Sequence, residues 1–156
     1  MFKDLNNKQI EKVISENIIG RLGCHADGEM YIVPISYAYD SKYIYFRSFE
    51  GLKLSMMRKN PKVCLQIDTI KDLANWESVI VWGSFEELTN EEDRNLALDK
   101  LMSRPIPKIA GEMMKLSAEW PFPAADYGQV EGVVYRIRIT KKSGRKEVMD
   151  MELHRK

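Results

Sequence analysis

The sequence predicts a mainly β protein with flanking helices, built around a six-stranded antiparallel β-barrel. Six segments alternate apolar and polar residues with the period of two that is typical of half-buried strands. Short turns join most of them, and helical patterns stand only between hairpins and near the ends, which does not fit a parallel β-α-β sheet. A small antiparallel barrel is therefore favoured. The predicted strands are residues 18–24, 30–39, 43–48, 62–68, 76–87 and 133–140.

Two residues interrupt the strand pattern. Pro34 lacks the N–H that a strand ladder needs, so the middle of its strand should lie at an edge, a bulge or an opening that can admit a ligand. Gly83 lies inside the longest strand-like run, where it permits a bend or a close approach by another group. Cys24 and Cys64 match no metal or redox motif and lie in apolar runs, so we expect two reduced thiols.

Helices are expected at four places between and around these strands. Asn6 or Asn7 can cap a short first helix, and Leu52 and Met56 recur at helical spacing before Pro61 ends the second. A capping-box pattern at residues 89–92 predicts a third helix to about residue 102, and a further short helix fits residues 109–116. Residues 141–156 are expected to form a charged, partly disordered tail.

Length and charge restrict the organisation and the partners. The 156 residues have the size of one ordinary domain, so a single domain over residues 1–156 is expected. Basic and acidic residues nearly cancel, 24 against 23, which gives no overall field to recruit nucleic acid or an anionic membrane. The charged N-terminus does not resemble a signal peptide, and no apolar run reaches the length of a membrane span. We therefore expect a cytoplasmic protein without nucleic-acid or membrane partners.

The stretch from Tyr43 to Pro61 changes from strand to helix periodicity around a turn at residues 49–51. The strand end delivers Arg47 and Ser48 beside the first turn of a helix that carries Lys53. Backbone N–H groups at a helix start lack intrahelical partners, and with these side chains they suit a phosphate. A solvated basic surface is the alternative that these residues alone leave open.

Three segments of the chain, residues 19–39, 43–68 and 79–88, together resemble the FMN-binding split-barrel family related to pyridoxamine 5′-phosphate oxidase. Within that family they are most similar to the nitroimidazole-resistance-like proteins. The segment YIYFRSFEGLKLSMMRKNPKVCLQID is the most specific of the three. The resemblance implies a six-stranded split barrel that forms a homodimer, with two FMN sites at the subunit interface.

The resemblance also implies which residues bind the cofactor. The phosphate would be held at Arg47, Ser48 and Lys53, with Gly51 and Leu52 at the start of the helix. The flavin ring would lie against the strand that contains Val33, Pro34, Ile35 and Ser36. The residues are chemically suitable, because FMN offers a phosphate of about −1.5 to −2 charge to the cations and a row of polar ring atoms to free backbone groups.

The aromatic loop from Trp120 to Tyr127 has two interpretations. It can cover the flavin, with Trp120 as a cofactor-binding residue, or it can merely join a helix to the last strand. His25, at the tip of the first hairpin, is either a solvent-exposed turn residue or a catalytic group. We expect no metal site and assign no catalytic residue, since a flavin carries the redox chemistry itself.

Two functional classes follow. The first is an FMN-dependent oxidoreductase that passes electrons from a reduced nicotinamide to a small acceptor such as a nitroaromatic. The second is a protein that holds FMN, or haem as some split-barrel relatives do, without turnover. The sequence contains no dinucleotide glycine fingerprint, so any contact with the nicotinamide would be transient. Strands rich in Tyr, Val and Trp on both faces also leave surplus apolar surface, which favours a two-fold interface.

Overall fold

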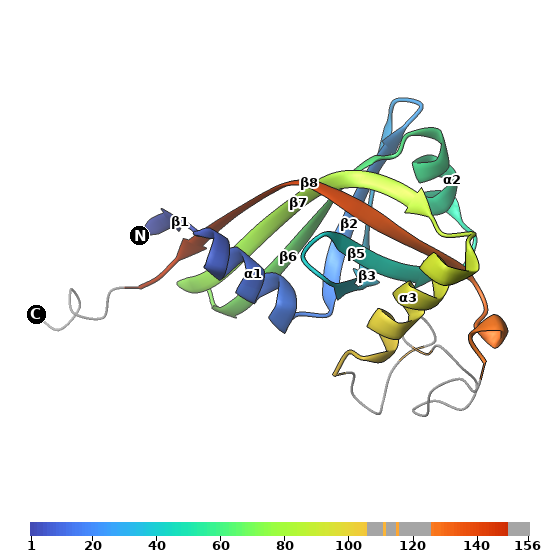
Figure 1. Cartoon of the computed structure of the whole chain (residues 1–156). Coiled ribbons are helices and arrows are strands. Elements are labelled where there is room, and N and C mark those ends of the chain that lie inside the picture. The colour runs from blue at the N-terminus through green and yellow to red at the C-terminus, as the bar shows by residue number, and fades with distance from the viewer. Residues whose placement is uncertain (106–110, 112–114, 116–125, 150–156) are drawn as a thin grey trace, which may run out of the picture.

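The strands form one antiparallel sheet that curls across the molecule (Figure 1). The structure is a computed structural model that describes residues 1–105, 111, 115 and 126–149. The strand order is β3-β2-β6-β7-β8-β5-β4, and β1 also pairs with β8. The strands are β1 (Phe2–Asp4), β2 (Ile19–Ala26), β3 (Glu29–Ser36), β4 (Ala38–Tyr39), β5 (Tyr43–Ser48), β6 (Lys62–Asp72), β7 (Asn75–Glu87) and β8 (Val133–Glu147).

The mainly β, antiparallel architecture is confirmed, but the predicted six-stranded barrel is not, because the sheet of the described residues is not closed and the number of strands differs. The described residues contain eight strands. The predicted strand over residues 30–39 is two strands, because Tyr37 separates a part that pairs with β2 from a part that pairs with β5. The other addition is β1, which is three residues long and too short to show a period of its own.

Residues 141–147, which were expected to belong to a charged, partly disordered tail, form part of a strand. They continue β8 and pair with β7 on one side and, at their end, with β1 on the other. Their many charged residues hide the strand in the sequence, since the pairing that stabilises them comes from segments far away along the chain. Leu5, just after β1, adds a backbone bond from its N–H to the Gly144 oxygen at 2.9 Å.

Three α-helices flank the sheet in the described part of the chain: α1 (Asn7–Glu16), α2 (Leu52–Lys59) and α3 (Glu91–Met102). Asn6 caps α1, in a capping box with Gln9. Asn90 caps α3 by accepting a bond from the Asp93 N–H. A short 3-10 helix covers Tyr127–Gln129, and the further helix expected over residues 109–116 falls outside the described residues except at positions 111 and 115.

The core lies on both faces of β5, because this strand is covered on each side. Ile44 and Phe46 belong to the large cluster inside the curled sheet, which also takes up the apolar face of α1. Tyr45 belongs to a second cluster, which β5 and β8 form with the buried face of α3. In consequence Arg47, two residues after Tyr45, is on the α3 side of the strand, and Ser48 is on the interior side.

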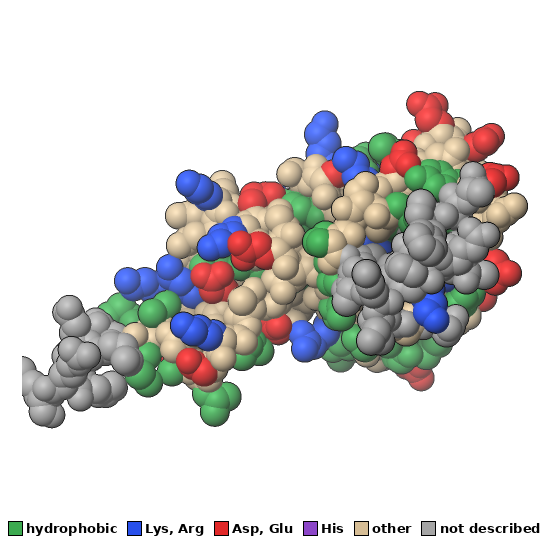
Figure 2. Space-filling view, turned by 90° about the horizontal axis from the view of Figure 1, so that it is seen from below, with side chains coloured by type: hydrophobic (Ala, Val, Ile, Leu, Met, Phe, Trp, Pro, Cys, Tyr) green, Lys and Arg blue, Asp and Glu red, His purple; other side chains and the backbone are tan. Residues whose placement is uncertain are grey.

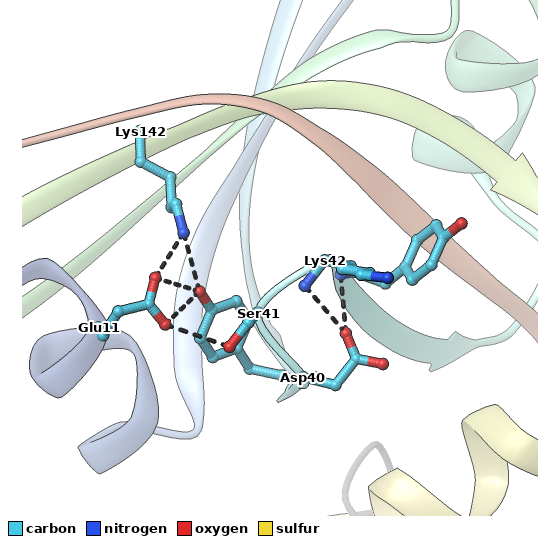
Figure 3. A network of polar contacts seen from close by, with 7 residues as sticks. Glu11, Asp40, Ser41, Lys42 and Lys142 are labelled. Atoms are coloured by element: carbon cyan, nitrogen blue, oxygen red, sulfur yellow. Dashed lines mark hydrogen bonds and ion pairs between the residues drawn. The ribbon is translucent and has the colours of Figure 1, made fainter. Parts of the chain in front are cut away.

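Polar contacts fasten α1 to the sheet. Glu11 of α1 accepts hydrogen bonds from the Tyr39 hydroxyl at 2.6 and 2.7 Å and forms an ion pair with Lys142 of β8 (Figure 3). Lys142 also donates to the Tyr39 oxygen at 3.1 Å. The Tyr37 hydroxyl donates to the Ile14 carbonyl at 2.7 Å. These bonds tie α1 to the segment that leads from β3 into β4.

Gly83 lies where the predicted bend occurs. The pairing of β7 with β8 shifts between Trp82 and Gly83. A Cβ atom at Gly83 would lie 2.4 Å from the Arg138 carbonyl oxygen, which no side chain tolerates. The shift is therefore a bulge that only glycine fits at this point.

The face of the molecule drawn in Figure 2 carries charges of both signs in a mixed arrangement. This agrees with the near balance of 24 basic and 23 acidic residues in the sequence. In the part of the chain that the structure describes, none of the helices has the length and apolar character needed to cross a membrane.

Candidate functional site

The sheet is open between β3 and β5. β3 is the strand at one end of the sheet order, and β5 is next to the short end strand β4, which Tyr37 alone joins to β3. Ala38 pairs with Tyr45, so extending that register by two residues places Ser36 opposite Arg47. No pairing joins those two positions among the described residues. The opening that Pro34 predicts therefore lies between Ser36 and Arg47.

The backbone along this edge of β3 can be worked out from its pairing with β2. The Tyr37 N–H donates to the Ile18 oxygen at 2.9 Å, so these two residues form a hydrogen-bonded pair. Such pairs alternate with non-bonded pairs along an antiparallel ladder, which turns the polar groups of Val33 and Ile35 toward β2. Those of Pro34 and Ser36 point to the open edge. Since Pro34 has no N–H, this edge offers the Pro34 carbonyl and both backbone groups of Ser36.

Arg47 is the charged residue at the other side of the opening. It is only 6% exposed, and its guanidinium lies 5.0 Å from the centre of the Phe49 ring and donates to the Lys115 carbonyl oxygen. Withdrawing a guanidinium from water is costly, and at 6% exposure Arg47 does not belong to a solvated basic surface.

Arg104, which the sequence analysis missed, lies beside Arg47. It follows the end of α3, where its Nε donates to the Leu101 oxygen at 2.7 Å. Its Nη1 donates to the Tyr37 oxygen at 3.2 Å and to the Ser36 hydroxyl, so it reaches across the opening to the end of β3. Burial lowers the pKa of Arg104 to about 10, and the positive charge of Arg47 adds to this effect. The only feature of the sequence that pointed to Arg104 was its position directly before Pro105, which ends the helix.

The side chains of Ser48 and Lys53 do not share the environment of the Arg47 side chain. The Ser48 hydroxyl is buried and donates to the Tyr135 hydroxyl at 3.1 Å inside the sheet. Lys53 is half-buried, and burial lowers its pKa, while the nearby Cys24 opposes that shift. The structure thus brings Arg47 together with Ser36, and leaves the side chains of Ser48 and Lys53 on the interior side.

The start of α2 is accessible. In the described part of the chain no side chain caps its first turn, and Gly51, which precedes Leu52, has extended backbone. A Cβ atom at Gly51 would meet no described atom within 4 Å, and Leu52 is exposed. The free N–H groups of this turn are therefore open to an anion.

Comparison with known proteins identifies the family. The sequence profile described as pyridoxamine 5′-phosphate oxidase matches residues 6–146. The chain belongs to this family. Its predicted resemblance is thereby confirmed.

Solved structures of similar proteins support this assignment to the pyridoxamine 5′-phosphate oxidase family. A protein of Mesorhizobium loti, described as FAD-binding, is 32% identical over 94% of this chain and 98% of its own, with a TM-score of 0.71. A candidate 5-nitroimidazole antibiotic resistance protein of Bacteroides thetaiotaomicron is 20% identical over 94% of this chain and 89% of its own, with a TM-score of 0.68. At that identity the second likeness shows the fold alone.

An uncharacterized protein of Rhizobium meliloti is a further relative. It is 38% identical over 84 residues, which make up 54% of this chain and 56% of the relative. The chain thus matches just over half the length of that curated relative.

The remaining residues that the sequence singled out in this member of the pyridoxamine 5′-phosphate oxidase family are Trp120, His25, Cys24 and Cys64. Trp120, which was expected to contact the cofactor, lies outside the described residues. His25 is exposed on β2 and lines a shallow apolar hollow on the outer face of the sheet, away from the interior cluster. Cys24 and Cys64 are free thiols, as expected, the first buried and the second half-buried.

Proposed function

We propose that the chain binds a flavin at the opening between β3 and β5 and acts as an oxidoreductase. The observation that carries the proposal is the buried Arg47 guanidinium, placed opposite the free edge of β3 at Ser36. The family assignment and the relative described as FAD-binding, at 32% identity over almost the full length of both chains, support it. FMN is the flavin proposed.

The residues at the opening fit the two ends of such a cofactor. Arg47 and the uncapped start of α2, at Gly51 and Leu52, would hold the phosphate through charge-assisted and backbone hydrogen bonds. The Pro34 carbonyl and the backbone groups of Ser36 would meet polar atoms at the edge of the ring. A bound flavin supplies the capacity to accept and release electrons, which no side chain has.

The protein itself would position the reactants and limit water. Ile35 and Tyr37 are buried beside the opening, and the α1 bonds hold that segment in place. The proposed reaction oxidises a reduced nicotinamide and reduces a small acceptor such as a nitroaromatic. Because the sequence has no dinucleotide fingerprint, the nicotinamide would bind only transiently at the exposed face of the site.

A non-catalytic flavin carrier is the second candidate. Arg47, Arg104 and Ser36 are the described polar side chains at the opening, and none of them is an acid or a base near neutral pH. Turnover would then depend entirely on the cofactor and the substrates. This makes a rate measurement the way to separate the two candidates.

We also propose that the protein is a homodimer. The register of four strands aligns Ile32, Gly23, Cys64 and Trp82 in one row on the outer face of the sheet. These residues line an apolar hollow of about 300 Å³, and Ile32 is 71% exposed there. An exposed apolar face on a sheet is suited to an isologous contact with a second copy.

The proposal is tested with the purified full chain. We expect a flavin absorbance spectrum, and chromatography of the released cofactor distinguishes FMN from FAD. Titration of the apo-protein with FMN should show that Arg47→Ala weakens binding by about 1.5 to 3 kcal/mol, the range for a charged hydrogen bond, while the exposed Arg145→Ala has no effect. Lys53→Ala tests whether the ammonium also reaches the phosphate.

Rates then decide between the candidates. Bleaching of the bound flavin by NADH or NADPH, followed by reoxidation with a nitroaromatic over many cycles, supports the oxidoreductase. A bound flavin that neither nicotinamide reduces identifies the carrier. A protein that takes up no flavin at micromolar concentration, or an Arg47→Ala variant with unchanged affinity, refutes the site.

A further inference from the structure

We propose that Arg104 is the second arginine of the anion site, and that Arg47 and Arg104 together select the phosphate monoester of FMN over flavins without one. The inference rests on the proposed function and deepens it. It assigns a ligand-binding role to a residue whose sequence context shows only the end of a helix.

The geometry brings the two guanidiniums to one place from separate elements. Arg47 comes from the end of β5, opposite Ser36 in the extended register. Arg104 comes from the end of α3 and is fixed on the Ser36 hydroxyl and the Tyr37 carbonyl. The bond from its Nε to the Leu101 oxygen orients the group further. Arg104 therefore reaches the end of β3, and the charge of Arg47 is near enough to act on it.

The hydrogen bonds of Arg104 leave it able to bind a ligand. Its three acceptors are a hydroxyl and two carbonyls, all uncharged. They engage Nε and Nη1, and Nη2 makes no bond to a described residue. Nη2 carries two N–H donors, which can donate to phosphate oxygens while Nε and Nη1 keep their bonds to the protein.

The electrostatics of the pair favour an anion with more than one charge. Two like charges that are both withdrawn from water repel each other, and the charge of Arg47 contributes to the lowered pKa of Arg104. A phosphate monoester carries about −1.5 to −2 charge at neutral pH and several acceptor oxygens, so it can accept hydrogen bonds from both guanidiniums. Riboflavin has no phosphate, and each phosphorus of the FAD pyrophosphate carries one negative charge only.

The test is a binding cycle with two ligands and two proteins. FMN and riboflavin are titrated into the apo-forms of the parent and of Arg104→Gln. We expect FMN affinity to fall about tenfold to a hundredfold in the variant, the range for a lost charged hydrogen bond, while riboflavin affinity changes by less than about twofold. FAD should lose less than FMN.

Arg94→Gln is the matched control. Arg94 belongs to the same helix and also donates to backbone oxygens, those of Tyr127 and Val130 at 2.8 Å each. Like Arg104→Gln, this substitution removes an arginine that joins α3 to neighbouring segments. It should leave the ratio of FMN to riboflavin affinity unchanged. Arg104→Lys, which keeps the charge without the fork, should recover part of that ratio.

A second measurement does not need flavin. Inorganic phosphate added to the apo-protein should raise the midpoint of thermal unfolding of the parent and of Arg94→Gln more than that of Arg104→Gln or Arg104→Lys. An equal loss of FMN and riboflavin affinity in Arg104→Gln, or equal stabilisation of all forms by phosphate, overturns the inference and leaves the flavin site standing. Phosphate stabilisation that requires Arg104 in a protein that binds no flavin supports the anion site and refutes the proposed function.

Discussion

Replacing Glu11 by glutamine should loosen α1 from the sheet without changing the shape of the side chain. The carboxylate accepts from the Tyr39 hydroxyl and pairs with Lys142 (Figure 3). In Glu11→Gln the bond from Tyr39 becomes neutral, and the ion pair with Lys142 becomes a bond from the ammonium to a neutral amide oxygen, a difference of about 1 kcal/mol each. The side chains of Glu11 and Lys142 are 35% and 26% exposed, so water screens part of this, and we expect a loss of about 1 to 2 kcal/mol.

The pH dependence of this loss has a definite sign. Burial alone would raise the pKa of Glu11, but the bonds from Lys142 and Tyr39 outweigh it and hold the pKa below its ordinary value of 4.5. A carboxyl whose pKa is lower in the folded state stabilises the protein above its unfolded pKa, and that contribution disappears as pH falls through the folded pKa. The difference between parent and variant should therefore be full at pH 7 and shrink below about pH 4.5.

Thermal unfolding at a series of pH values measures the effect. For a chain of this size the midpoint should fall by about 2 to 8 °C at pH 7. Glu16→Gln is the control, since Glu16 is exposed at the end of the same helix. Equal midpoints for the two variants, or a Glu11→Gln deficit that persists unchanged in acid, would refute the reasoning.

Three further predictions concern the core, the bulge and the outer face. Tyr37→Phe leaves the buried Ile14 carbonyl without the hydroxyl bond of 2.7 Å and should cost about 1 to 3 kcal/mol in urea unfolding; an unchanged midpoint contradicts the bond. Gly83→Ala forces a Cβ to within 2.4 Å of a backbone oxygen of β8 and should cost about 1 to 3 kcal/mol, whereas Gly51→Ala, which meets no atom within 4 Å, should leave stability nearly unchanged. Ile32→Glu on the exposed outer face should halve the mass found by sedimentation without lowering the stability of the subunit; a parent chain that already sediments as a monomer removes the proposed interface.

Local patterns were sufficient to predict most elements. The period of two located β5 at its observed bounds, and the helical spacing of Ile10, Val13 and Ile14 matches the buried face of α1. Pro34 correctly indicated an opening at the free edge of β3. In each case the residues that make up the pattern are close together in the sequence.

The parts that the sequence did not predict depend on distant partners. The end of β8 is stabilised by β7 and β1, and its charged residues mask the alternation. Arg104 reaches the site because α3 ends beside β3 and β5, a placement that no local period encodes. The contact of the Ser48 hydroxyl with Tyr135 also needs a distant strand, although the alternation along β5 already places Ser48 and Arg47 on opposite faces.

The passage of the chain through Tyr37 has a mechanical consequence. One residue links the two edges of the sheet, so widening the gap would require Tyr37 to rotate. Its ring is 1% exposed and its hydroxyl is anchored on α1, and Tyr39 is anchored there as well. Helix α1 therefore restricts the movement of Tyr37 and keeps the gap between β3 and β5 at a fixed width. A ligand at the proposed site would therefore meet a fixed, preorganised edge of β3, and little conformational entropy would be lost when it binds.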